Sequence, residues 1–101
     1  MYTKILKYGD IKENSATTRT IDGVEIAVFK VGGKIYALKN NCPHQHFSLL
    51  HEGEIFNGTV TCPMHGWTFD LATGLSTTGQ GKATTYQVQV KGSDILVDIE
   101  A

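Results

Sequence analysis

The sequence predicts an all-β fold, an antiparallel β-sandwich or barrel with a small subdomain inserted into it. Val, Ile and Thr make up 27 of the 101 residues, which is a composition typical of strands. Apolar and polar residues alternate in several stretches, and glycine marks most of the breaks between them. Helical periodicity is weak throughout. A chain of this length holds one domain, residues 1–101.

The two ends of the chain supply the larger unit. Six strands are predicted there, over residues 3–7, 15–21, 24–31, 35–38, 86–90 and 95–100. Gly32-Gly33 and Gly92-Ser93 separate neighbouring strands at the spacing of two-residue hairpins. Where apolar residues recur at every second position, as in 24–28, one face of the strand is apolar, so these strands are expected to be half-buried.

The middle of the chain has a different pattern. Its apolar segments are short, at residues 54–56, 59–61 and 67–69, and glycines interrupt them. We interpret residues 40–81, approximately, as a subdomain of short strands and loops inserted between the two ends. Both cysteines lie in it.

Composition and charge exclude several classes of protein. Nine Lys and Arg against ten Asp and Glu give a net charge of -1, with no basic cluster of the kind that binds nucleic acid. No apolar run approaches the roughly 20 residues that span a bilayer, so no membrane association is expected. The N-terminal residues lack the apolar core of a signal peptide, which indicates a cytoplasmic protein.

Each cysteine is followed by a proline and a histidine. The two motifs are Cys42-Pro43-His44 and Cys62-Pro63-Met64-His65, with 17 residues between them, and they hold both prolines of the chain. Because proline fixes φ, both loops are expected to be stiff and to hold their side chains ready for a ligand.

Three interpretations fit this set of two cysteines and two histidines. A tetrahedral zinc site uses the same donors, and an iron–sulfur centre is the second interpretation. The third interpretation is a chance grouping of buried thiols and surface histidines. The spacing favours iron, because the side chains of Cys42 and His44 could reach two metals about as easily as one, and neither histidine lies on a helical pattern.

Together the two motifs, Cys42-Pro43-His44 and the run from Cys62 to Trp67, resemble the Rieske [2Fe–2S] motif, and the resemblance covers nearly the whole chain. It implies one [2Fe–2S] cluster per chain. Cys42 and Cys62 would bind one iron, and His44 and His65 the other.

The surrounding residues extend the resemblance. Phe69-Asp70 and Thr73-Gly74 resemble the F-D…T-G stretch of the family, in which the glycine would make a turn. Leu49 or Leu50 would fill the apolar position behind the first loop. Residues 78–82 match a third loop that usually contains proline; here it has none, which implies a more mobile lid.

Three neighbouring residues distinguish between classes of the family. High-potential respiratory members carry an additional disulfide and a serine near the cluster, whereas this chain has Phe47, Met64 and Trp67 at those positions. The resemblance therefore implies a low-potential ferredoxin. His46 and His51 are interpreted as loop or turn residues.

The function implied is that of an electron carrier with no substrate of its own, and not of an enzyme. Its transient partners would be a ferredoxin reductase and a terminal oxygenase that acts on aromatic rings, and the carrier itself would be monomeric. Glu52 and Glu54, near the first loop, would help to orient a partner. The alternatives are the small subunit of an NAD(P)H nitrite reductase and a zinc-binding interaction module.

Overall fold

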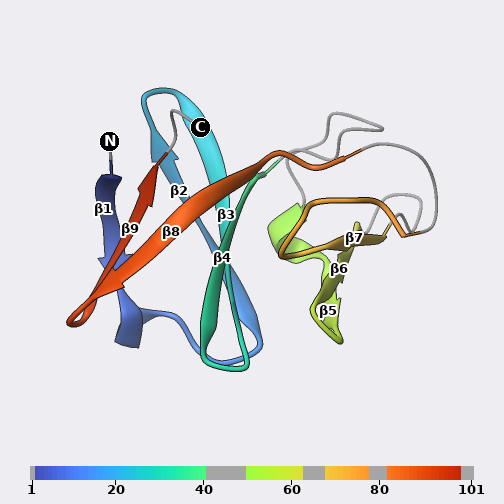
Figure 1. The fold of residues 1–101 in the computed structure, drawn as a ribbon, viewed down its shortest axis with the longest axis horizontal. Coiled ribbons are helices and arrows are strands. Elements are labelled where there is room, and N and C mark those ends of the chain that lie inside the picture. The colour runs from blue at the N-terminus through green and yellow to red at the C-terminus, as the bar shows by residue number, and fades with distance from the viewer. Residues whose placement is uncertain (1, 41–49, 63–67, 78–81, 99–101) are drawn as a thin grey trace.

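The computed structural model describes residues 2–40, 50–62, 68–77 and 82–98, which form two antiparallel sheets (Figure 1). The larger sheet has six strands in the order β1-β9-β8-β4-β3-β2, and the smaller has three in the order β5-β6-β7. The strands are β1 (Tyr2–Lys7), β2 (Ser15–Ile21), β3 (Val24–Val31), β4 (Lys34–Lys39), β5 (Glu54–Phe56), β6 (Thr59–Thr61), β7 (Thr68–Asp70), β8 (Thr85–Lys91) and β9 (Asp94–Asp98). Two single-turn 3-10 helices, η1 (Tyr8–Asp10) and η2 (Leu50–Glu52), complete the described elements. None of the described helices has the length and apolar character that a membrane crossing needs.

The predicted all-β, antiparallel architecture is confirmed. The six predicted strands are present, and each of the three short apolar segments of the middle region overlaps a strand, with ends that differ by a residue or two. Residues 67 and 99–100 of these ranges lie outside the described residues. The hairpins form where the glycines predict them: φ is 61° at Gly32 and 77° at Gly33, between β3 and β4, and 60° at Gly92, between β8 and β9. Positive φ at both central residues, as at Gly32 and Gly33, or at the first of them, as at Gly92, is the geometry of a two-residue hairpin that follows the strand twist.

The larger sheet is curled, and a side chain joins its two edge strands. Arg19 lies in β2, at one edge, and its Nε donates a hydrogen bond of 3.2 Å to the carbonyl oxygen of Ile5 in β1, at the other edge. Ile5 stands at a β-bulge, where the register between β1 and β9 shifts. A bulge turns the local backbone out of the regular ladder, which makes this carbonyl available to the guanidinium.

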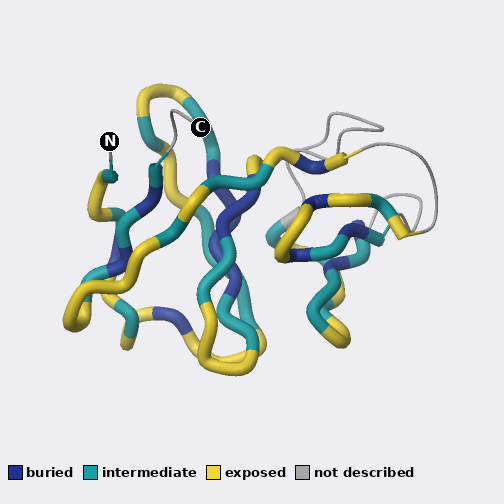
Figure 2. Tube along the Cα trace, in the orientation of Figure 1, coloured by how far each residue is buried: buried dark blue, intermediate teal, exposed yellow. Residues whose placement is uncertain are grey.

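Strand β3 is buried on both faces, so the expectation that it is half-buried was wrong. Residues 26–29 are all 0% exposed (Figure 2). Ile26 and Val28 belong to a core inside the curled sheet, whereas Ala27 and Phe29 belong to a second core shared with the small sheet. The small sheet covers the face that period-two alternation would leave to solvent.

A carboxylate closes the turn between β3 and β4. Glu13 accepts hydrogen bonds from the backbone N–H of Gly32 at 2.5 Å and of Gly33 at 2.9 Å. The bond from Gly33 and then that from Gly32 lower the pKa of Glu13 from its ordinary value of 4.5, and the charge of Lys30 contributes less.

The Glu13→Gln variant is expected to melt at a lower temperature than the wild type at neutral pH. Because the folded protein lowers the pKa, the ionised carboxylate stabilises the fold above 4.5, and this contribution is lost as the pH falls through the folded-state value. The two melting temperatures should therefore converge below the ordinary pKa. Thermal unfolding followed by circular dichroism from acid to neutral pH measures this. Asp10→Asn, another exposed carboxylate of the same segment, is the matched control, and an equal pH dependence in both variants would contradict the role of Glu13.

Candidate metal centre

Cys62 is the candidate ligand that lies within the described residues. It directly follows β6 and is 1% exposed. The core around it is the one shared by the two sheets and includes Val60, Phe69 and Ala83. This apolar packing keeps water away from the sulfur. Cys42 and His44 fall in residues 41–49 and His65 in 63–67, all outside the described residues.

Asn40 holds the two ends of residues 41–49 together. Its side-chain Oδ1 accepts a hydrogen bond of 2.9 Å from the backbone N–H of His51, and its Nδ2 lies 2.9 Å from the Nδ1 of the His51 ring. The same Nδ2 donates to the Glu25 carboxylate at 3.2 Å, and the backbone N–H of Asn40 donates to the Glu25 carbonyl at 2.9 Å. The start of this segment is therefore bonded both to β3 and to η2, where the segment ends.

A pair of threonines holds together the two strand ends that flank residues 63–67, and we call such a pair of flanking ends the base of a segment. Thr61, at the end of β6, and Thr68, at the start of β7, are directly paired across the small sheet. Their hydroxyl oxygens are 2.9 Å apart. Cys62 comes immediately after Thr61, so this hydrogen bond fixes the strand end from which the cysteine projects.

The base of residues 78–81 is held by contacts on the other side of β7. The backbone N–H of Thr77 donates to the Thr68 carbonyl at 2.8 Å, and Leu75 and Lys82 form an isolated antiparallel bridge. The backbone N–H of Ala83 donates to the Gly74 carbonyl at 2.7 Å. Gly74 has φ of 79°, which confirms the turn that the sequence indicates at this glycine.

Shared hydrogen bonds join these three bases into one platform. Thr68 contacts the base of residues 63–67 through its hydroxyl, and the base of residues 78–81 through its carbonyl. The backbone N–H of Lys39, next to Asn40, donates to the Thr84 carbonyl at 2.8 Å, which links the first base to the third. The structure therefore brings together the ends of all the segments that carry the candidate ligands.

These anchors were not predicted from the sequence. Asn40 is a polar residue at the end of an apolar strand, two positions before Cys42. This position is the one feature of the sequence that could have indicated its role. His51 is a turn residue in η2, as expected, although its contact with Asn40 was missed. Leu49, residues 78–81 and the side chain of Leu50 lie outside what the structure describes, as do His46, Phe47, Met64 and Trp67, so the expectations for them stay predictions.

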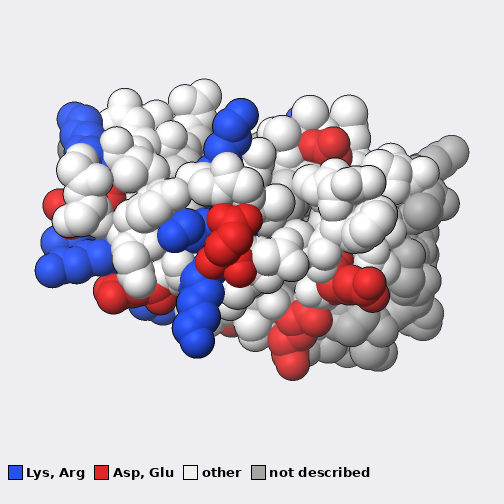
Figure 3. Space-filling model, turned by 90° about the horizontal axis from the view of Figure 1, so that it is seen from below, with Lys and Arg blue, Asp and Glu red and all other residues white. Residues whose placement is uncertain are grey.

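Acidic side chains predominate on the small-sheet end of the molecule. Residues 40–81 contain Glu52, Glu54 and Asp70 and no Lys or Arg. Glu52 and Glu54 are exposed, and Figure 3 shows acidic side chains in the right-hand half of this face. Lys82, directly after this range, is also exposed. Phe56, next to this acidic pair, is 68% exposed.

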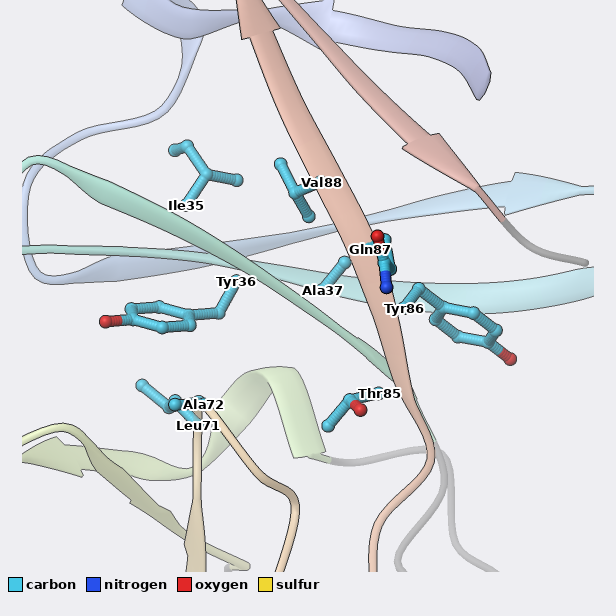
Figure 4. Close-up of a pocket in the computed structure, with 9 residues that line it drawn as sticks. All are labelled: Ile35, Tyr36, Ala37, Leu71, Ala72, Thr85, Tyr86, Gln87 and Val88. Atoms are coloured by element: carbon cyan, nitrogen blue, oxygen red, sulfur yellow. The ribbon is translucent and has the colours of Figure 1, made fainter. Parts of the chain in front are cut away.

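A cavity of about 380 Å³ opens between the two sheets (Figure 4). It is lined by Ile35, Tyr36, Ala37, Leu71, Ala72, Thr85, Tyr86, Gln87 and Val88, and none of these is a candidate ligand. Partial burial raises the pKa of Tyr86 from its ordinary value of 10.0. At neutral pH this tyrosine therefore lines the cavity as a neutral phenol.

The surroundings of Cys62 fit a metal-bound thiolate. A buried thiol in apolar packing is shielded from solvent, and thiolate sulfur is a preferred donor both for zinc and for iron–sulfur iron. The donor set alone is therefore compatible with either metal.

Comparison with known proteins separates the two. The chain matches the Rieske [2Fe-2S] domain family over residues 1–97. Among curated relatives, the 3-phenylpropionate/cinnamic acid dioxygenase ferredoxin subunit of Shigella boydii serotype 4 (strain Sb227) is 41% identical over 76 residues. The alignment covers 73% of this chain and 72% of the relative.

The solved structures that superimpose on this chain also include dioxygenase ferredoxins. The ferredoxin of carbazole 1,9a-dioxygenase from Nocardioides aromaticivorans IC177 superimposes with a TM-score of 0.88 at 29% identity, covering 95% of each chain. A carbazole 1,9a-dioxygenase ferredoxin solved in complex with its oxygenase gives 0.85 at 25% identity, over 95% of this chain and 91% of that one. A Mycobacterium tuberculosis protein named as an NADH-dependent nitrite reductase small subunit gives 0.89 over 96% and 93% of the two chains, but its 19% identity shows a shared fold alone.

Proposed function

Because the chain belongs to the Rieske [2Fe–2S] domain family, we propose that it is a ferredoxin that carries single electrons from a ferredoxin reductase to a terminal oxygenase of aromatic rings. The observation that carries this proposal is the 41% identity to a dioxygenase ferredoxin subunit, over most of both chains. The likeness to a ferredoxin solved together with its oxygenase supports the choice of partner. The protein is accordingly an electron carrier and not itself an enzyme.

The cofactor of the family is a [2Fe–2S] cluster, and we assign its ligands as Cys42 and Cys62 on one iron and His44 and His65 on the other. When bound, the cluster accepts and releases one electron. The residues of the chain hold and shield it: Cys62 projects from the end of β6 into a core that excludes water. The anchors around Asn40 and Thr68 fix the ends of the segments that bear the other ligands. We propose that residues 40–81 act as the cluster-binding subdomain of a single domain, residues 1–101.

The cytoplasm is the compartment that suits this chemistry. Cysteines must stay reduced to bind iron, and the cytoplasm keeps thiols reduced. An isolated monomer meeting its partners transiently suits a carrier that must bind a reductase and an oxygenase in turn, through small interfaces.

Reconstitution with purified partners tests the proposed function. The protein is mixed with NADH, a flavin-containing ferredoxin reductase and a ring-hydroxylating oxygenase with its aromatic substrate, and product formation is measured. We expect product in proportion to the protein added and none with a Cys42→Ser variant. A reductase that cannot reduce the protein, or a stable stoichiometric complex with a nitrite reductase large subunit, would support the alternative instead. Colourless protein with stoichiometric zinc would support the zinc module.

The acidic small-sheet end is expected to steer the partners. Replacing Glu52 and Glu54 by lysine should change the rate of reduction by the reductase roughly tenfold at low ionic strength, and much less at high salt, because screening removes long-range attraction. Stopped-flow reduction across a salt series measures this rate, and the reduction potential should stay nearly unchanged. Asp10→Lys makes the same type of charge change in η1, beside the larger sheet, and is the matched control. Equal rates in all variants at every salt concentration would place the docking surface elsewhere.

A further inference from the structure

Asn40 has an unusual environment for a polar residue. It is 1% exposed, and among the residues that the structure describes it is the fully buried one with a polar side chain. A buried amide that lacks partners costs roughly 1–3 kcal/mol, so burial at this position requires hydrogen bonds. Asn40 has them on two sides, from Glu25 in β3 and from His51 in η2.

The partners of the amide determine its orientation. The backbone N–H of His51 can only donate, so the atom that faces it is the carbonyl oxygen of Asn40. The carboxylate of Glu25 accepts when ionised, so the atom that faces it is the amide nitrogen. The second N–H of that nitrogen then points to Nδ1 of His51, which accepts and leaves the ring proton on Nε2. A leucine of similar volume could satisfy none of these contacts.

The contacts join positions on either side of one ligand-bearing segment. Asn40 and His51 are 11 residues apart in the chain, and residues 41–49 between them contain Cys42 and His44. Glu25 ties the same amide to β3, which pairs with β2 and β4 in the larger sheet. The distance between the two ends of the segment is therefore set by one side chain that is itself fixed to the most buried strand.

We propose that Asn40 is a positioning residue: it holds both ends of residues 41–49 in place and so sets the geometry with which Cys42 and His44 meet the metal. This inference rests on the ligand assignment made above. Residues that support metal ligands fix their orientation, and the loss of such a support typically weakens metal binding by 10- to 100-fold. Asn40 has this role through the backbone of the segment and touches no reacting group.

A swap of donor and acceptor tests the hydrogen bonds directly. Asn40→Asp keeps the oxygen that accepts from His51 N–H but places a second carboxylate against Glu25. Glu25→Gln alone keeps an acceptor for the Asn40 amide. Combining the two substitutions restores a hydrogen bond with its direction reversed, because the new amide at position 25 donates to the new carboxylate.

Three measurements on the cluster-containing protein provide the readout: the rate of cluster loss in the presence of a chelator, the EPR spectrum of the reduced protein, and hydrogen exchange at the His51 amide. We expect Asn40→Asp to lose its cluster at least about tenfold faster than wild type, with a changed EPR spectrum. Glu25→Gln should stay close to wild type, and the double variant should recover to within roughly threefold. Asn40→Ala, which removes the acceptor, should in addition accelerate exchange at His51.

Val28→Ala is the control for a general loss of stability. Val28 is buried in the core inside the curled sheet, so its truncation destabilises the protein without touching this network. Cluster loss and EPR spectra in the Asn40 variants that match those of Val28→Ala would overturn the proposal, and so would a double variant no better than Asn40→Asp. None of these measurements uses a reductase or an oxygenase, so failure to deliver electrons to an oxygenase would overturn the proposed function and leave the result for Asn40 standing.

Discussion

The Cys62→Ser protein is expected to purify without iron or labile sulfide and to unfold at a markedly lower temperature than the wild type. A serine hydroxyl is a shorter and harder donor than a thiolate, and Cys62 lies at 1% exposure in an apolar core. Burying a hydroxyl there costs about 1–3 kcal/mol before the loss of the cluster is counted. Each kcal/mol lowers the melting temperature of a domain of this size by roughly 4–8 °C. Iron and sulfide analysis, the visible spectrum and thermal unfolding measure the three effects.

A matched variant separates loss of the ligand from damage to the core. Val60→Ala removes methyl groups from the same core, two residues before Cys62, and should cost about 1–3 kcal/mol while the cluster remains. Cys42→Ser should behave as Cys62→Ser does, because metal binding and folding are coupled in so small a protein. Full iron and sulfide in either serine variant would contradict the assignment of that cysteine as a ligand.

The strands were predictable because local chemistry determines them. Gly32 and Gly33 allow the positive φ of a tight hairpin, and β-branched residues on either side favour extended backbone, so neighbouring residues alone predict β3 and β4. The same holds for the hairpin at Gly92. The pairing of β1 with β9 joins opposite ends of the chain, and no local pattern indicates that partner.

Burial of β3 was mispredicted because alternation reports one apolar face and not what covers the other. Ala27 and Phe29 are apolar, but the sequence does not show that the inserted small sheet packs on them. A strand buried on both faces reads as a continuous apolar run, and the run from Ile26 to Phe29 was the signal for this.

The candidate ligands were predictable from spacing, whereas their supports were not. Two Cys-His motifs predict the donors because metal ligands need particular side-chain types at short intervals, and Cys42, His44 and His65 lie outside the described residues. The supports join residues that are distant in sequence, such as Asn40 with Glu25 and with His51. Asparagine, glutamate and histidine have many possible partners, so their pairing follows only from the three-dimensional fold.

Gly74→Ala is expected to destabilise the protein by roughly 2–5 kcal/mol, the largest effect of any single methyl group considered. A Cβ at this position would lie 2.2 Å from the Ala83 carbonyl oxygen and 2.9 Å from Cγ2 of Thr85. The first of these atoms is backbone and can move only with its strand, so overpacking of about 1–3 kcal/mol or more adds to the strain of a φ of 79°. Denaturant unfolding measures the loss, and cluster release should accelerate because Gly74 accepts the hydrogen bond that holds Ala83 at the base of residues 78–81.

The Gly92→Ala variant separates the effect of the steric contact at Gly74 from the effect of positive φ. Gly92 also has positive φ, 60°, but nothing lies within 4 Å of the position that its Cβ would take. Its substitution should therefore cost only the conformational term, about 1–2 kcal/mol, and leave the rate of cluster release unchanged because it lies in the distant β8–β9 hairpin. If both alanine variants lose the same stability, the close approach to Ala83 contributes nothing, and Gly74 is present for its turn alone. Suppose instead that the two losses of stability differ by about 2 kcal/mol or more and that cluster release is faster in Gly74→Ala only. This result would show that Gly74 lets the two ends of residues 78–81 meet.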